Sequence, residues 1–294
     1  MAVFQINAFA DEASVSLAGQ IEACLENGVR GIEMRGVNGK SVVDLSDEEA
    51  AAAREQVESA GLVISAMGSP FGKISITDDF APHLAKFERG LALCELLGVQ
   101  RMRIFSFYIP EGQDPALYRD EVLRRMDQML TAAEKAGVFC AHENEKGIYG
   151  DNDARCLDLL QHFRGRMGGI FDPANFIQCG VSPQAALPEL YPYLSWLHVK
   201  DAFMEDGSVV PAGQGDGAIP EILAQLGDFG GALHLTVEPH LTIFEGLSAL
   251  QSETLNHRFH YPDSRAAFRA AVGALKNLLT QQGYKEEEHG LWTR

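Results

Sequence analysis

The sequence predicts an α/β protein, namely a single (β/α)8 TIM barrel domain that spans residues 1–294. Eight apolar, strand-like runs follow one another at fairly even intervals, with helical patterns between them. Several of these helices end at a glycine just before the next run, which is typical of repeated parallel β/α units. The chain has 294 residues, of which 46% are hydrophobic, and a closed barrel needs about 250. An open doubly wound sheet is the alternative, but no GxGxxG turn follows the first run, which disfavours a dinucleotide-binding sheet.

The predicted elements follow in order along the chain. The eight strands are expected at residues 3–8, 31–34, 62–67, 101–105, 138–142, 169–172, 196–200 and 233–238. Ser46 and Glu49 have the spacing of a capping box, which opens a helix that ends at Gly61. Further helices are expected at about 82–97, 117–136 and 263–279, and the first two stop at Gly98 and Gly137.

Composition limits the partners that the chain can have. Its formal net charge is −17, and such a surface repels phosphate backbones, so we expect no binding to nucleic acid. Five scattered cysteines without a CxxC pair indicate reduced thiols. No apolar stretch has the length of a membrane span and no secretory signal is visible, so we expect a cytoplasmic protein without membrane contact.

Two segments lack clear periodicity. Residues 239–262 form a long loop after the last predicted strand, and such loops at this end of a barrel often serve as a lid or a subunit contact. A homo-oligomer is therefore one expectation. The polar tail at 283–294 is expected to fray or to dock on a partner.

Four side chains close four consecutive predicted strands in the second half of the chain. They are Glu143, Asp172, His198 and Glu238. Taken singly, each would more often be a helix cap, a solvated carboxylate or a hydrogen-bonded core histidine. Together at the carboxyl end of a barrel, where active sites are built, they predict a divalent metal site. Three oxygen ligands and one imidazole favour Mn²⁺, Mg²⁺ or Co²⁺, and Zn²⁺ is a further candidate.

Other inward-facing positions surround these four. Lys200 and Glu145 lie two residues beyond His198 and Glu143, so they share the same face if the strand geometry continues. Lys200 is expected to neutralise an enolate, to bind a carboxylate, or simply to pair with Asp201 or Glu145. Two further inward residues, Glu33 and Arg103, are expected either to bind substrate or to pair with each other. A loop lysine, Lys73, is a weaker candidate for a phosphate contact.

The sequences that carry these residues resemble a known family. ENEKG at 143–147, FDPANF at 171–176, HVKD at 198–201 and VEPH at 237–240 resemble the xylose-isomerase-like barrel superfamily, in particular its sugar-phosphate isomerase/epimerase branch. The glycine-rich PAGQGD at 211–216 is also similar to a turn found there. The resemblance covers essentially the whole chain.

The resemblance implies a function for the site. The residues matching Glu143, Asp172, His198 and Glu238 would hold one divalent metal. The two glutamates would also shuttle a proton through an enediolate of a sugar, sugar phosphate or polyol. Asn175 stands where many relatives carry a histidine; it can bind a sugar hydroxyl but cannot shuttle protons. Glu145, Asn175 and Lys200 are therefore the expected substrate-binding residues.

Three other functions remain open on the same barrel. A dehydratase of a cyclic polyol ketone would share the metal and the enolate, with Lys200 placed to protonate the leaving hydroxyl. An apurinic-site endonuclease would need additional histidines after strands three and four and a DxxH pair after strand six, which this sequence lacks. A non-catalytic sugar-binding barrel would turn over nothing.

Overall fold

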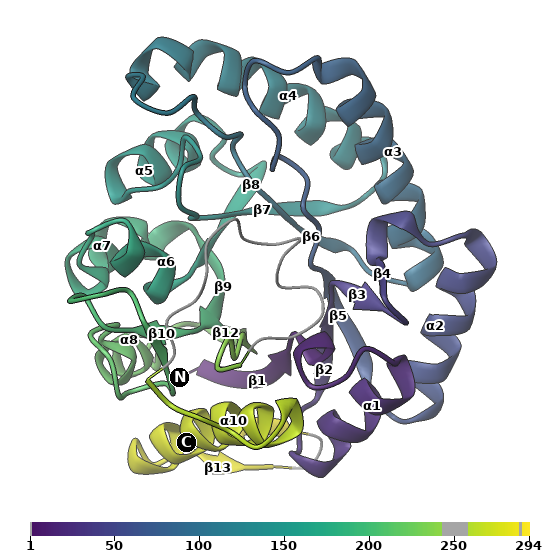
Figure 1. The fold of residues 1–294 in the computed structure, drawn as a ribbon, viewed down its shortest axis with the longest axis vertical. Coiled ribbons are helices and arrows are strands. Elements are labelled where there is room, and N and C mark those ends of the chain that lie inside the picture. The colour runs from purple at the N-terminus through teal and green to yellow at the C-terminus, as the bar shows by residue number, and fades with distance from the viewer. Residues whose placement is uncertain (1, 243–257, 288–289) are drawn as a thin grey trace.

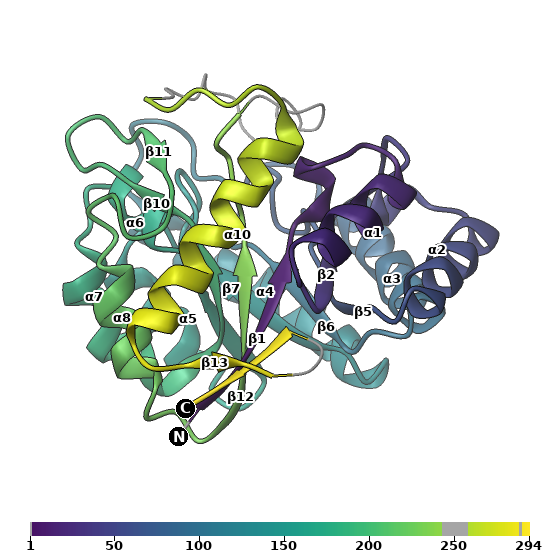
Figure 2. The same ribbon diagram turned by 90° about the horizontal axis from the view of Figure 1, so that it is seen from below.

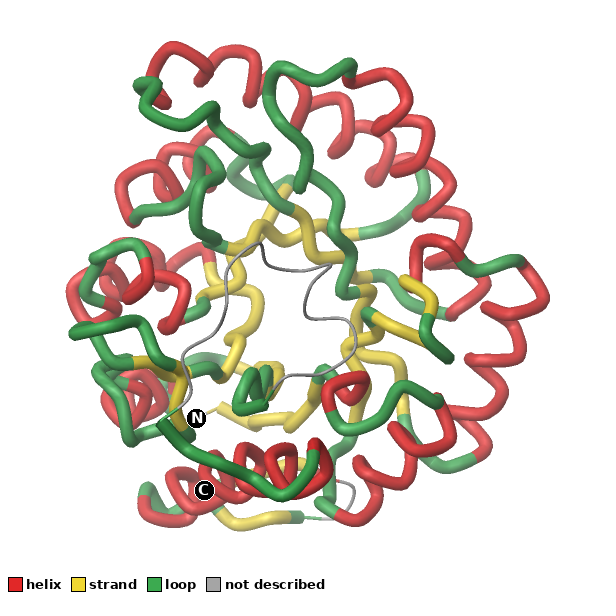
Figure 3. Tube along the Cα trace, in the orientation of Figure 1, coloured by secondary structure: helices red, strands yellow, loops and turns green. Residues whose placement is uncertain are grey.

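The computed structural model describes residues 2–242, 258–287 and 290–294. Within them, eight parallel strands close into a barrel that helices surround, as Figures 1 and 3 show. The strands are β1 (Ala2–Ala8), β2 (Gly31–Met34), β5 (Val63–Met67), β6 (Arg101–Ile104), β7 (Phe139–Glu143), β8 (Met167–Phe171), β9 (Leu194–Val199) and β12 (Gly231–Val237). Pairing of β12 with β1 closes the ring. The predicted single TIM barrel is confirmed, and each predicted strand has a counterpart.

The register of the strands brings their carboxyl ends to one rim. The first and last strands pair in parallel from Ala2↔Gly231 to Ala8↔Val237. Thr236 of β12 lies opposite His198 of β9, so side chains of the two strands point inward at the same level. The pairing of β8 with β9 shifts between Gly169 and Ile170, a local irregularity just before the end of β8.

The helices form the outer layer. They are α1 (Leu17–Glu26), α2 (Asp47–Ser59), α3 (Phe80–Leu97), α4 (Arg119–Lys135), α5 (Asp153–His162), α6 (Pro173–Gln178), α7 (Pro183–Leu190), α8 (Ile219–Leu226) and α10 (Ser264–Gln281). The capping box at Ser46 and Glu49 is confirmed at the start of α2. The helix predicted at 117–136 is divided, because a 3-10 turn, η3 (Pro115–Tyr118), precedes α4.

Short strands sit on the rim and at the opposite end. The rim carries β3 (Gly36–Val37), β4 (Lys40–Ser41), β10 (Asp201–Ala202) and β11 (Val209–Val210). At the other end, β13 (Lys285–Glu286) and β14 (Leu291–Thr293) form a hairpin from the C-terminal residues, and β14 pairs antiparallel with β1. Figure 2 shows both chain termini at this end. The tail thus docks on the chain's own first strand. Most of the loop predicted at 239–262 lies outside the described residues, at 243–257.

The glycine-rich turn after β11 is built around one carboxylate. Asp201 accepts hydrogen bonds from the backbone N–H groups of Gly213, Gly215 and Gly217, at 2.8–3.0 Å. A Cβ at Gly215 or Gly217 would collide with this carboxylate, so both positions require glycine. The turn therefore fixes the rim beside β9.

A small apolar cluster fills the barrel below its carboxyl rim. Its members are Ala66, Ala141, Ile170 and Trp196. Three of them precede Glu143, Asp172 and His198 by two residues along their strands, so they lie on the same inner face one level deeper. This cluster is the floor of the site. Among the described residues, no helix has the length and apolarity needed to cross a bilayer.

Candidate metal centre and active site

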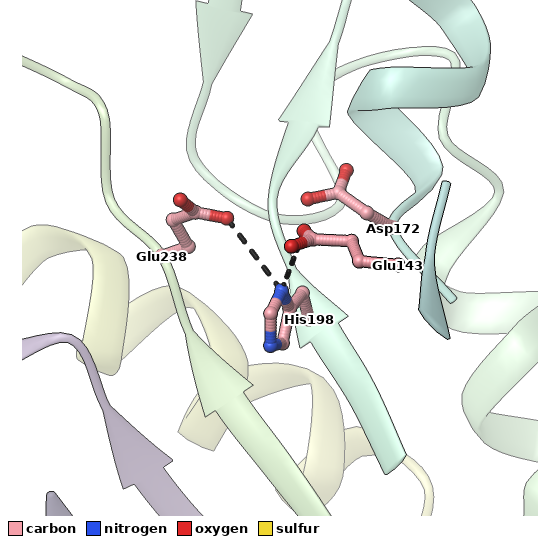
Figure 4. A group of neighbouring side chains, drawn as sticks. All are labelled: Glu143, Asp172, His198 and Glu238. Carbon is pink, nitrogen blue, oxygen red and sulfur yellow. Dashed lines mark hydrogen bonds and ion pairs between the residues drawn. The ribbon is translucent and has the colours of Figure 1, made fainter. Parts of the chain in front are cut away.

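The structure brings the four predicted ligands together at the rim (Figure 4). One ligand atom from each of Glu143, Asp172, His198 and Glu238 lies within 4.8 Å of the others, and all four residues are buried. In the ring, β9 lies between β12 and β8. Glu238 therefore lies on one side of His198, and Asp172 and Glu143 lie on its other side. Their proximity is observed, whereas their role as ligands stays a prediction.

Two arginines hold the outer oxygens of the two glutamates. Arg103 Nη1 donates to Glu143 Oε2 at 3.0 Å, and Arg35 Nη1 donates to Glu238 Oε1 at 3.2 Å. Both guanidinium groups pack against the Phe9 ring, with their Cζ atoms 4.9 and 4.4 Å from its centroid. The remaining oxygen of each glutamate is thereby turned toward His198.

The aspartate is oriented by the start of a helix. Asp172 is the N-cap of α6, and its Oδ1 accepts the backbone N–H of Asn175 at 2.8 Å. Asn144 braces the same place, because its side chain bonds both backbone groups of Asp172. Asp172 Oδ2 accepts no hydrogen bond from the described residues, and Lys200 Nζ lies 3.0 Å from it.

The predicted substrate residue Asn175 is partly committed to the protein itself. Its Nδ2 donates to the carbonyl of Asn144 at 2.9 Å, whereas its buried Oδ1 has no hydrogen-bond partner among the described residues. The carbonyl oxygen of this amide is therefore open to a ligand hydroxyl.

The histidine has a carboxylate on each of its ring nitrogens. His198 Nδ1 lies 2.7 Å from Glu143 Oε1, and its Nε2 lies 3.3 Å from both oxygens of Glu33. Thr236 Oγ1 also donates to Glu33, at 2.8 Å. Burial lowers the pKa of His198, but Glu143 and Glu33 outweigh it and raise that pKa to about 10. A carboxylate behind the distal nitrogen is the usual support of a metal-binding histidine.

The predicted pairing of Glu33 with Arg103 is wrong. Glu33 contacts His198 and Thr236, whereas Arg103 reaches Glu143 and the carbonyls of Gly68 and Ser69. Glu33 on β2 thus crosses the barrel mouth to β9 and β12, which are not its neighbours, whereas Arg103 on β6 reaches Glu143 on the adjacent strand β7.

Lys200 also has other partners than those expected. Its Nζ lies 3.0 Å from Asp172 Oδ2 and 3.1 Å from Glu238 Oε2, instead of pairing with Asp201 or Glu145. Burial lowers the pKa of Lys200, but these two carboxylates outweigh it and raise that pKa above its usual range. In turn, burial raises the pKa of Asp172 to about 7 against the opposing effect of Lys200.

A small polar cavity opens above these groups. Its lining comprises Arg35, Lys73, Arg103, Glu143, Glu145, Lys200, Glu238 and His240. The predicted substrate residue Glu145 accepts from Lys73 Nζ at 2.7 Å, so the lysine proposed as a phosphate contact is engaged with a carboxylate. Both side chains stay slightly accessible, at 13% and 11%. They mark the side of the cavity that a substrate would meet first.

Sequence reasoning missed a second group of charged residues on the rim. Glu12, Glu238 and His240 also offer ligand atoms within 4.8 Å of one another. Arg35 already neutralises this group, since its Nη2 donates to Glu12 at 3.1 Å and it bonds Asp11 as well. Burial raises the pKa of Glu12 to about 8, although Arg35 lowers it. Residues two apart on a strand face the same way, so the inward position of Glu33 could have indicated Arg35, and that of Glu238 could have indicated His240. Nothing in the sequence points to Glu12.

The site fits a divalent metal by its donor chemistry. Each carboxylate has one oxygen fixed by a protein donor and one that faces the common centre, and the imidazole is held from behind. The fold and the site together thus define a barrel with a potential metal centre at its carboxyl rim.

Comparison with protein-family models identifies the family to which this barrel belongs. Residues 21–253 match the family model described as the xylose isomerase-like TIM barrel, so the chain belongs to that family. No curated protein matches the sequence significantly.

Solved structures with this fold cover nearly the whole chain. An L-ribulose 3-epimerase is 16% identical with a TM-score of 0.72 and covers 96% of this chain and 97% of its own. The probable 3-DHS dehydratase AsbF from Bacillus anthracis is 16% identical with a TM-score of 0.69, covering 94% and 99%. The IOLI protein with a bound zinc atom is 15% identical with a TM-score of 0.72, covering 94% and 98%. At these identities the likeness establishes the fold.

Proposed function

We propose that this protein is a divalent-metal-dependent isomerase or epimerase that acts on a sugar, a sugar phosphate or a polyol. The observation that carries the proposal is the pair Glu143 and Glu238, which flank His198 and turn one oxygen each toward the shared centre. Two carboxylates that reach one substrate carbon from different strands can remove a proton and return one. The L-ribulose 3-epimerase among the structural neighbours supports the same class of reaction.

The metal would be held by Glu143, Asp172, His198 and Glu238. When bound, a divalent ion supplies Lewis acidity that makes the carbon beside a carbonyl acidic enough for a carboxylate to deprotonate. The three carboxylates favour Mn²⁺, Mg²⁺ or Co²⁺. The zinc atom in the IOLI structure keeps Zn²⁺ as a candidate.

The residues divide the remaining work. One of Glu143 and Glu238 takes the proton from the carbon to leave an enediolate of the substrate, and the other returns a proton to complete the isomer. Burial raises the pKa of Glu143, but His198 and Arg103 outweigh it and lower that pKa to about 2, so this carboxylate is ionised at neutral pH. The arginines keep both glutamates in position. Glu145, Asn175 and Lys200 would bind the hydroxyls of the substrate.

A dehydratase is the second candidate. Lys200 lines the cavity as a buried ammonium, so it could donate a proton to a hydroxyl that leaves from the carbon next to the enolate. The probable dehydratase AsbF has the same fold.

A deuterium experiment separates these possibilities. Ketoses, aldoses and inososes are incubated with Mn²⁺ and the protein in D₂O, and the products are followed by NMR and mass spectrometry. We expect deuterium at the carbon beside the carbonyl, in a product whose formula is otherwise unchanged. Loss of water from a compound in the panel would instead establish the dehydratase.

Variants identify the acid–base residues. We expect either Glu143→Gln or Glu238→Gln to abolish exchange, whereas Glu55→Gln, at an exposed position of α2, should exchange as the wild type does. Normal exchange in both site variants would refute the assigned roles. A folded, metal-loaded protein that labels nothing and binds the sugars would support a non-catalytic barrel.

A further inference from the structure

We propose that the Lys200 ammonium and the divalent metal compete for the same carboxylate oxygens, so that metal loading releases Lys200 into the substrate cavity. The inference rests on the proposed metal site and adds a regulatory role for a residue of this chain. In this view, Lys200 serves as the counter-ion of the metal-free protein and becomes a substrate contact only when the metal is present.

The first step of the argument concerns which oxygens are available. Asp172 Oδ1 is occupied by the backbone N–H of Asn175, and Glu238 Oε1 is occupied by Arg35. The other oxygen of each carboxylate faces the centre, and Lys200 Nζ contacts both of them, at 3.0 and 3.1 Å. Two of the three oxygens that a metal would use are therefore the two that the lysine holds.

The second step concerns charge. The side chain of Lys200 is 2% exposed, and those of Asp172 and Glu238 are 0% and 4% exposed, so solvent cannot screen this place. A divalent ion at this centre would be coordinated by these oxygens directly. An ammonium group left on the same two oxygens would be a close, unscreened neighbour of that ion, and the two cations would repel each other. Loading therefore favours departure of the ammonium from at least one carboxylate.

The third step concerns where the ammonium can go. Lysine carries its charge on a flexible four-carbon stem, so it can change partners without a change in the backbone. Lys200 and Glu145 line the same cavity, and this carboxylate already interacts electrostatically with the ammonium. Glu145 and the hydroxyls of a bound substrate are thus the new partners. Metal binding and substrate binding become coupled through one side chain, because a ligand that engages Lys200 also frees Asp172 and Glu238 for the metal.

The competition is tested by metal affinity, without any turnover. The 294-residue chain is stripped with a chelator and titrated with Mn²⁺ by calorimetry, or by the EPR signal of free Mn²⁺. We expect Lys200→Met to bind Mn²⁺ at least about tenfold more tightly than the wild type, a difference of about 1.4 kcal/mol. Lys86→Met is the control, since it removes the same charge at an exposed position of α3, where the ammonium pairs with Asp44 and neither with a proposed ligand nor with Glu145. Its affinity should stay within about twofold.

Unchanged or weaker Mn²⁺ binding in a folded Lys200→Met protein overturns the inference. So does a failure of both wild type and variant to bind Mn²⁺, which would remove the metal site as well. Tighter binding in the variant together with no deuterium exchange in the wild type would refute the proposed reaction and leave the competition standing.

A second measurement covers the case in which Lys200→Met does not fold without metal. Crystals of the wild type are compared with and without Mn²⁺. We expect Lys200 Nζ within hydrogen-bond distance of Asp172 and Glu238 in the metal-free crystal, and away from at least one of them in the loaded one. A loaded crystal in which the ammonium still bonds both inner oxygens would refute the proposal.

Discussion

Two levels of the barrel interior, one step apart along the same strands, are built in opposite ways. The floor consists of apolar side chains that pack against one another, including Ala141, Ile170 and Trp196. The rim above it consists of carboxylates and cations that are as deeply buried as the floor. Burial of the floor stabilises the fold directly, whereas burial of the rim costs free energy unless every charge is paired. The contrast agrees with the proposed function, in which the rim would carry the chemistry while the floor stabilises the fold.

The largest expected effect comes from removing a proposed ligand from the rim. His198→Ala should lower the affinity for Mn²⁺ by more than about 100-fold. The imidazole is one of the four proposed ligands, and removing a ligand costs more metal affinity than removing a residue that only supports one. Mn²⁺ titration of chelator-stripped protein measures this affinity, and elemental analysis of protein purified without chelator shows how much metal each variant keeps. His162→Ala, at the exposed end of α5, is the control that should keep its metal. Equal metal content in both variants would count against the site.

Loss of one arginine should show how the charges of the rim are balanced. Arg103→Met leaves Glu143 without its guanidinium partner, and breaking a buried ion pair on one side costs about 3 kcal/mol. We expect urea unfolding to show this loss in metal-free protein and a smaller loss with Mn²⁺. The exposed Arg124, which pairs with Glu121, provides the contrast, since Arg124→Met should cost less than about 1 kcal/mol. Similar losses in the two variants would contradict the role of burial.

A change in the floor should affect stability without affecting the metal. Ile170→Ala removes a buried side chain and should destabilise the fold by about 2–4 kcal/mol in urea. The Mn²⁺ stoichiometry should stay that of the wild type under native conditions. If metal binding were lost along with stability, the two levels could not be separated as described.

The smallest effect concerns a histidine outside the barrel. His83 on α3 accepts the backbone N–H of Gly72, and burial, followed by Lys86 and Arg125, lowers its pKa to about 4. As the pH falls, His83 therefore takes up its proton in the unfolded chain before it does so in the folded chain. The contribution of neutral His83 to folding stability is present above about pH 6.5 and is lost as the pH falls toward 4.

The effect of His83 on folding stability is modest because the side chain is only half-buried. We expect about 1 kcal/mol less stability at pH 5 than at pH 7 from this residue, after allowing for solvent screening. Urea titrations across this range should show a shallower pH dependence for His83→Gln than for the wild type. Identical slopes would mean that the pKa of His83 is the same in the folded and the unfolded chain, which would contradict the lowered value.

The sequence was sufficient to predict the strands and the four clustered residues because both follow from short-range rules. Each strand is a compact apolar run, and each of Glu143, Asp172, His198 and Glu238 stands at the end of one. Parallel strands of a barrel deliver their ends to the same rim, so residues far apart in sequence could be placed together without any knowledge of contacts.

The partners of the long side chains could not be predicted in this way. Arg103 was placed inward correctly, but its length lets it reach Glu143 as readily as any other acid on the rim. Lys200 was likewise placed at the site with the wrong partners. Glu12 lies in a 3-10 turn after β1, where no periodicity reports which way a side chain points. Such pairings depend on the three-dimensional distances between strands, which the sequence does not contain.

The strand formed by the last residues of the chain has a consequence for how the protein is made. The second barrel strand, β2, reaches β1 only at Asn7 and Ala8, and β14 takes the earlier part of β1 at Phe4 and Gln5. The other edge of β1 is covered by β12, which is also synthesised late. During synthesis β1 therefore keeps most of its backbone hydrogen-bonding groups without their final partners until β12 and β14, which lie far later in the chain, have been made.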